Sequence, residues 1–257
     1  MALICTVSAT LTCQHLEWAD YVELTAWDNY PYLAFVAEGR IGNAVSGGGT
    51  HEIDVGYTTG GPFLAGQTAD YPWGSGQEVS FTLTYDSVSK LVSFNVGGTV
   101  VSFIYAHTQS PTEIIIRTRS NADGQIMHVY NLVLDGVSVS CEAKAEGAYA
   151  GQYVYNSANP GLDLIWITGG TLTDGFTLTG KARMTWVGSP SGSVIAFQIK
   201  VGEHGTLPPP TPPPPPVGGE WIPIDKLQLL PLWTSLASTI AVAASLVGIK
   251  RIKKRQD

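Results

Sequence analysis

The chain has 257 residues, of which 44% are hydrophobic and only 14% charged, and its formal net charge is −7 at pH 7. Low charge with 29 glycines and frequent Thr and Ser is typical of short strands joined by glycine turns and disfavours a helical fold. Before residue 220 there are eight basic side chains against eighteen acidic ones, which argues against nucleic acid as a partner because phosphate binding needs a basic face.

Apolar and polar residues alternate repeatedly through residues 1–206, and period-two alternation is the pattern of a half-buried strand. Turn dipeptides such as Gly97–Gly98 and Asp135–Gly136 separate the runs. We therefore predict an all-β fold, a β-sandwich or jelly roll, formed by residues 1–206 as one ectodomain. The predicted strands include Leu33–Val36, Glu52–Tyr57, Val79–Tyr85, Leu91–Val96, Val100–Tyr105, Glu113–Arg119, Met127–Leu134, Leu162–Ile167, Phe176–Leu178, Ala182–Trp186 and Ser193–Lys200.

Three cysteines occur, at Cys5, Cys13 and Cys141. If residues 1–13 form one strand, Cys5 and Cys13 lie roughly 27 Å apart and cannot bridge each other. Either of them can reach Cys141, and we predict a Cys13–Cys141 disulfide, with free buried thiols as the alternative. No cysteine and histidine spacing suits zinc, so no metal site is predicted.

The most enzyme-like segment is His51-Glu52-Ile53-Asp54-Val55, in which Glu52 and Asp54 lie on one face of a predicted strand. This segment resembles the catalytic strand of laminarinase-like glycoside hydrolases, which are β-sandwiches. That family has another glutamate shortly after the aspartate, whereas Gly56 and Tyr57 follow here, so the acid of a two-carboxylate mechanism is missing. The simpler interpretation is that Ile53 and Val55 pack inward while the two carboxylates face solvent or a calcium ion.

Tyr71 and Trp73 lie on a predicted loop bounded by proline and glycine. Exposed aromatic rings of this kind stack on sugar rings, although aromatics in a sandwich more often belong to the core. Glu52, Asp54, Tyr71 and Trp73 are therefore the candidate ligand-binding residues. No cofactor is predicted; Ca²⁺ stays an alternative, since the acidic turns supply oxygen ligands without forming a complete calcium loop.

A proline-rich segment over residues 207–220 follows the head, with eight of the chain's 16 prolines in it. Successive prolines favour an extended polyproline II rod, so we expect a stalk. Residues 221–249 follow as a membrane-proximal segment and a helix, in which Leu227–Ile249 carries no charge. At 1.5 Å per residue this run spans about 34 Å, enough to cross a hydrocarbon core of about 30 Å.

The tail over residues 250–257 carries five cations. The positive-inside rule places this tail in the cytoplasm and the head outside the cell, as a single-pass membrane protein. That orientation needs an export signal, and none is evident in residues 1–13. We expect that the true start lies upstream; the alternative is a tail-anchored protein with a cytoplasmic head.

Several short sequence phrases follow one another along the chain: Ala37–Asn43, Glu52–Gly56, Trp73–Gly76 leading into Phe81–Asp86, Ile115–Arg119, Asn131–Gly136, and Gly175–Gly180 before Ala196–Lys200. Taken in this order, they resemble the choice-of-anchor W domain, a prokaryotic surface domain found with different C-terminal sorting or anchoring signals. The resemblance covers about residues 33–202 and implies no catalytic residues. The segment Ile222–Lys226 before the helix is similar to anchors of archaeal and some bacterial envelope proteins.

These patterns favour a non-enzymatic, membrane-anchored surface protein with a structural, adhesive or ligand-binding head. Its expected partners are the lipid bilayer, through Leu227–Ile249, and a surface glycan or protein. The alternative is a surface carbohydrate-active protein, either a lectin or a laminarinase-like glycoside hydrolase, that uses Glu52, Asp54 and the loop with Tyr71 and Trp73. The two hypotheses differ in geometry, because a hydrolase needs Glu52 in a cleft beside a second carboxylate.

Overall fold

The computed structural model describes residues 10–16, 33–47, 50–57, 65–106, 110–148, 161–190 and 195–203. These residues form two antiparallel sheets, with one short helix, α2 (Asn43–Ser46), and one 3-10 turn, η2 (Leu172–Asp174), among the described elements. The sequence-based prediction of an all-β fold is confirmed. The predicted stalk and the predicted membrane helix at Leu227–Ile249 lie outside the described residues. Within the described ranges, no helix has the length and apolar character needed to cross a bilayer.

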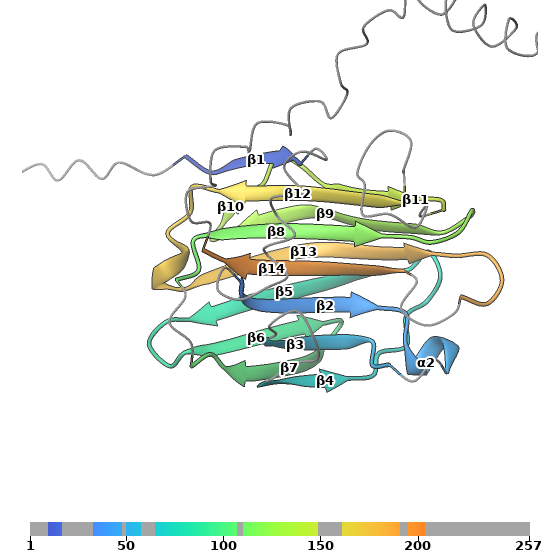
Figure 1. The fold of residues 1–257 in the computed structure, drawn as a ribbon, viewed down its shortest axis with the longest axis horizontal. Helices are drawn as coiled ribbons and strands as arrows, with labels where there is room; N and C mark the ends of the chain where they lie inside the picture. Colours follow the sequence, from blue (N-terminus) through green and yellow to red (C-terminus); the bar gives the residue numbers. More distant parts are fainter. Residues whose placement is uncertain are drawn as a thin grey trace, which may run out of the picture. The chain divides into compact units, whose positions relative to one another are not determined.

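Sheet A has seven strands, and β1 and β4 form its two edges (Figure 1). Each strand pairs antiparallel with its neighbours. In spatial order the strands are β1 (Thr12–His15), β12 (Leu162–Thr168), β8 (Glu113–Arg119), β14 (Ala196–Gly202), β2 (Leu33–Arg40), β3 (Ile53–Tyr57) and β4 (Ala65–Ala69).

Sheet B lies behind sheet A in the view of Figure 1. Its β6–β7 hairpin turns at Gly97–Gly98, where both residues have positive φ as a two-residue hairpin turn of this type requires. In spatial order the strands are β10 (Val137–Ser138), β9 (Ile126–Leu134), β13 (Phe176–Thr185), β5 (Glu78–Asp86), β6 (Leu91–Val96) and β7 (Thr99–Ile104), and β11 (Ala143–Glu146) pairs with β9.

The core lies between the two sheets and is built by the alternation that the sequence predicts. On β5, Val79, Phe81, Leu83 and Tyr85 are buried while the residues between them point away from the core. Aromatic rings from both sheets meet here, since the Phe81 and Phe197 ring centroids lie 5.6 Å apart. Burial of these large apolar side chains is the main stabilising contribution, at about 25 cal/mol per Å².

Sheet A departs from the expected one-sided burial, because all five residues of β3 are buried. A second apolar cluster, separate from the main core, is formed mainly by residues of β2, β8 and β12. Sheet A is thus covered on both faces over these strands, which period-two alternation by itself does not predict. The members of this cluster are Leu16, Leu33, Val36, Ile115, Leu162 and Leu164, with Trp166 packed against them.

A disulfide joins Cys13 on β1 to Cys141, which lies between β10 and β11. The two Cα atoms are 6.0 Å apart and 128 residues apart in sequence. Because β1 belongs to sheet A and β10 and β11 to sheet B, the bond ties the two sheets together at one side. In the chain-entropy description, a loop of this length stabilises the folded state by about 4 to 5 kcal/mol.

Candidate functional site

Glu52, the first of the two candidate carboxylates, is fully buried just before β3. Its Oε1 accepts hydrogen bonds from the backbone N–H groups of Ala44 at 2.5 Å and Val45 at 3.3 Å, at the start of α2. Its Oε2 accepts a third from the N–H of Tyr71, at 3.3 Å. The carboxylate therefore satisfies amides at a helix start and in a neighbouring loop, which is a structural role.

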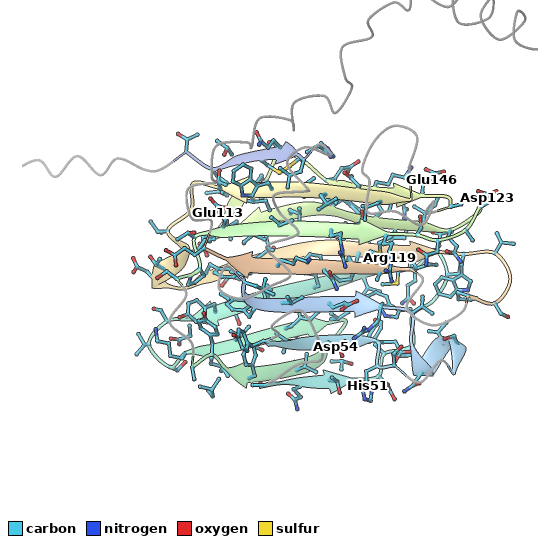
Figure 2. The ribbon with its side chains drawn as sticks, viewed as in Figure 1. His51, Asp54, Glu113, Arg119, Asp123 and Glu146 are labelled. Carbon is cyan, nitrogen blue, oxygen red and sulfur yellow. A yellow bond between two sulfur atoms is a disulfide. The ribbon has the colours of Figure 1, made fainter. Side chains whose placement is uncertain are left out.

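Asp54, the second carboxylate, lies on the face of β3 that points away from the inter-sheet core, and it is only 1% exposed (Figure 2). Its Oδ2 forms an ion pair with the Arg40 guanidinium, which also lies 3.6 Å from Glu38. Glu38 in turn accepts a hydrogen bond from the Gln198 side-chain amide at 3.1 Å. This buried polar row crosses β3, β2 and β14, and its members are engaged with one another.

The interpretation that Glu52 and Asp54 face solvent is wrong, whereas the inward packing of Ile53 and Val55 is confirmed. The alternating pattern placed the two carboxylates on the correct face of the strand. It did not reveal that this face is covered. A hydrolytic site needs a solvent-reachable carboxylate, and the hydrogen bonds that occupy Glu52 leave it unsuited to that role.

The two candidate aromatic residues, Tyr71 and Trp73, differ in how deeply they are buried. Trp73 is only 4% exposed and belongs to the core, as aromatic residues of a sandwich more often do, so it forms no exposed platform. Tyr71 is partly buried, and its ring meets Trp73 edge to face with centroids 4.8 Å apart. Burial raises the pKa of the Tyr71 hydroxyl, so it stays protonated at neutral pH.

Tyr71 lines an open pocket of about 510 Å³ on the outer face of sheet B. The lining residues come from β5, β6, the Gly97–Gly98 turn and the segment before β5. This volume lies within the range of about 300 to 1,000 Å³ that is typical of small-molecule sites. The pocket is lined by Tyr71, Gln77, Glu78, Val79, Ser80, Thr82, Asn95, Gly97 and Gly98.

A network of polar side chains holds one side of this pocket in place. Lys181 on β13 lies 3.0 Å from the Glu78 carboxylate and donates to the Ser80 hydroxyl at 3.1 Å. The Tyr130 hydroxyl donates to the other Glu78 oxygen at 2.5 Å. The hydrogen bond from Tyr130, followed by that from Lys181, lowers the pKa of Glu78, so this carboxylate is ionised at neutral pH.

Two titratable groups outside this pocket, both on sheet A, also have shifted pKa values. Half-burial raises the pKa of Glu113 to about 7, although the hydrogen bond from Trp166 Nε1 at 3.0 Å opposes the shift. Complete burial lowers the pKa of Lys200 to about 7. Glu113 lies at one end of β8, far along the strand from Arg119 (Figure 2). Both groups adjoin the apolar cluster around Ile115.

No group of three or more His, Cys, Asp or Glu side chains gathers at metal-binding distances in the part of the chain that the structure describes. A comparison with protein-family models finds no match for this chain, and a comparison with curated protein sequences finds none either.

The sequence pointed to Tyr71 but not to the residues that surround it. Ser80 and Thr82 alternate with core residues on β5, which is the pattern of any solvent-facing strand. Asn95 and the Gly97–Gly98 turn read as ordinary hairpin residues. Only the pairing of β5 with β6 and the position of Tyr71 beside the turn bring these groups into one pocket.

Proposed function

We propose that this chain is a membrane-anchored cell-surface protein without enzymatic activity, whose β-sandwich head lies outside the cell and binds a ligand. Residues 207–220 form its stalk, Leu227–Ile249 crosses the bilayer, and residues 250–257 remain in the cytoplasm. The observation that carries this proposal is the disulfide between Cys13 and Cys141. Such bonds form and persist in oxidising compartments outside the cytoplasm and are rare within it.

The charge distribution supports the same orientation independently of the disulfide. The uncharged run Leu227–Ile249 is followed by Lys250, Arg251, Lys253, Lys254 and Arg255. Cations next to a membrane segment are retained on the cytoplasmic side. An oxidised head and a basic tail next to the uncharged run both favour a topology in which the head is exported. They support this topology over the tail-anchored alternative with a cytoplasmic head.

The all-β head agrees with the resemblance to choice-of-anchor W domains, which implies a surface location and no catalytic residues. The hydrolase alternative is not favoured, because Glu52 and Asp54 are buried and bound to other groups of the protein. The lectin alternative is favoured by one observation, the polar pocket beside Tyr71. A non-enzymatic binding head is therefore the function that fits both the buried carboxylates of sheet A and the open pocket of sheet B.

Topology is tested by labelling intact cells that express the full chain behind a functional export signal. A membrane-impermeant amine reagent should modify Lys144, whose side chain is 45% exposed, but should not modify Lys250, Lys253 or Lys254 until the cells are permeabilised. Mass spectrometry reads both sets of sites in one sample. Alkaline carbonate washing should leave the chain in the membrane pellet.

Labelling of the tail lysines on intact cells, or release of the chain by carbonate, would overturn the proposal. The disulfide supplies an internal control in the same cells. Exported chain should resist thiol alkylation at Cys13 and Cys141 until a reductant is added, whereas chain retained in the cytoplasm should react without one.

A further inference from the structure

The Tyr71 pocket is rich in groups that donate and accept hydrogen bonds. Gln77 and Asn95 contribute side-chain amides, and Ser80 and Thr82 contribute hydroxyls. Side-chain amides and hydroxyls can each both donate and accept hydrogen bonds, which suits a ligand whose own groups do both. Sugar hydroxyls have this property, whereas an apolar ligand would leave these amides and hydroxyls without hydrogen-bond partners.

The charge of the pocket favours a neutral ligand. Glu78 is the one formally charged side chain in the lining, and Lys181 balances it at 3.0 Å from just outside. An anionic ligand such as a phosphate or sulfate needs an arginine, a lysine or a group of free backbone amides. None of the residues in the pocket lining is an arginine or a lysine.

Three of the polar side chains in the lining, Glu78, Ser80 and Asn95, are held in place by other groups of the protein. Tyr130 and Lys181 fix Glu78, and Lys181 also holds Ser80. The Asn95 Oδ1 accepts the N–H of Gly98 at 2.9 Å, which orients the amide so that its NH₂ group is the part left to donate. Side chains already ordered on paired strands lose little conformational entropy on binding, which favours affinity.

Tyr71 supplies the aromatic surface of the pocket. Trp73 supports its ring edge to face, and the hydroxyl end rests on Gly97, where a Cβ would overlap the phenol oxygen. An aromatic ring held in this way offers an apolar surface to the C–H face of a sugar while its hydroxyl keeps a polar contact.

We infer that the Tyr71 pocket is a binding site for a neutral saccharide, in which Tyr71 packs against the sugar ring and Thr82, Asn95 and Ser80 hydrogen-bond its hydroxyl groups. This inference rests on the proposed function, since it names the ligand class of the displayed head. It moves the binding surface away from Glu52 and Asp54 on sheet A. The site lies on the outer face of sheet B.

The test uses the full-length chain, purified in a detergent without a sugar headgroup, on an array of neutral gluco-, manno- and galacto-oligosaccharides together with sialylated and sulfated ones. Binding to at least one neutral oligosaccharide is expected, and its Kd is then measured by titration calorimetry. Tyr71→Ala should weaken that binding at least tenfold, and Thr82→Ala should weaken it about three- to tenfold.

Thr84→Ala is the matched control, because Thr84 lies on the same face of β5 two residues beyond Thr82 but outside the pocket. Its Kd should equal that of the wild type. If Tyr71→Ala fails to fold, Asn95→Ala and Tyr71→Phe replace it; folding is judged by the intact disulfide and by circular dichroism.

Three outcomes would overturn the inference: binding to no neutral saccharide at millimolar concentration, binding to sialylated or sulfated saccharides alone, or equal loss in Thr82→Ala and Thr84→Ala. Failure here is distinguishable from failure of the proposed topology. The purified chain reports on the pocket whichever side of the membrane it occupies, whereas amine labelling of intact cells reports on topology whether or not a sugar binds.

Discussion

The polar row on sheet A and the Tyr71 pocket on sheet B contain similar residue types but differ in what surrounds them. On sheet A, Glu52 and Asp54 are at most 1% exposed, and each is engaged by an amide or a guanidinium of the protein. On sheet B, Thr82 and Asn95 line an open volume of about 510 Å³. The first arrangement stabilises the fold, and the second leaves groups for a ligand.

This difference shows why a carboxylate motif is weak support for catalysis. A Glu-x-Asp strand places both carboxylates on one face, but the same face can be buried by the rest of the chain. Burial is then tolerated only when each charge is paired or hydrogen-bonded, as here. The sheet A groups are therefore expected to act on stability alone, and the sheet B groups on binding.

The largest expected effect comes from removing the partner of Asp54. Arg40→Met leaves the Asp54 carboxylate buried without its counter-charge, and it should destabilise the fold by about 3 to 4 kcal/mol. Urea unfolding of the full-length chain measures the change. The double variant Arg40→Met with Asp54→Leu should recover most of the loss, because the unpaired charge is gone. A single variant as stable as the wild type would contradict the buried ion pair.

Glu52→Ala should have the next largest effect and lower the free energy of unfolding by about 2 to 3 kcal/mol. The three backbone N–H groups of Ala44, Val45 and Tyr71 would lose a buried charged acceptor. Glu52→Gln keeps an acceptor of the same size, so it should cost less. Urea unfolding compares the two variants. A Glu52→Gln chain that is normally stable but has lost a measured hydrolytic activity would instead restore the hydrolase hypothesis.

Gly97→Ala should affect both the stability of the fold and the binding of a saccharide. The residue has φ of +57° and no room for a Cβ beside Tyr71, so we expect a loss of about 1 to 2 kcal/mol. Tyr71 would also shift, and saccharide binding would fall. Gly136→Ala is the control, since Gly136 also has positive φ, at +81°, with nothing near an added Cβ, and it lies outside the pocket. It should lose stability without the same loss of binding, as unfolding and calorimetry would show.

The smallest effect concerns pH. Between pH 4.5, where an ordinary glutamate titrates, and the Glu113 pKa of about 7, the folded chain keeps a proton that the unfolded chain has released. The contribution of this group to stability therefore falls as pH rises through that window. Glu113→Gln should gain stability over the wild type between pH 5 and pH 8.

That gain should stay near 1 kcal/mol, because the Glu113 carboxyl is only half-buried and solvent screens it. Urea unfolding at the two pH values measures it. The exposed glutamate substitution Glu146→Gln, on β11, is the control and should show no comparable gain. A variant whose difference from the wild type is the same at both pH values would contradict the raised pKa of Glu113.

Much of the fold was predictable because short-range periodicity encodes it. Leu91–Val96 and Glu113–Arg119 are strands with the predicted bounds, and the turn at Gly97–Gly98 has the positive φ values its glycines predict. The two predicted strands Phe176–Leu178 and Ala182–Trp186 correspond to one strand, β13, which continues through Gly180 and ends at Thr185, one residue before Trp186. Gly180 interrupts the alternation of apolar and polar residues from which strands were predicted, but pairing with both β5 and β9 keeps the strand continuous.

Other elements were not predicted because their local signal is weak. β4, with the sequence AGQTA, has little hydrophobic alternation and is held by its pairing with β3. The Cys13–Cys141 disulfide was predicted, but only as one of several states that the sequence allowed, because 128 residues separate the two cysteines. The sequence allowed free thiols or a bridge from either N-terminal cysteine, and the sheet arrangement selects Cys13.

The amino-acid sequence by itself determined the all-β class, most strand positions and the turns, because alternation and turn propensity are properties of neighbouring residues. It also determined the uncharged run and basic tail on which the membrane proposal rests. Only the tertiary structure decided that Glu52 and Trp73 are buried and that Tyr71, Thr82 and Asn95 share one pocket. Solvent exposure and proximity depend on how sheets pack, which residue order along a single strand does not specify.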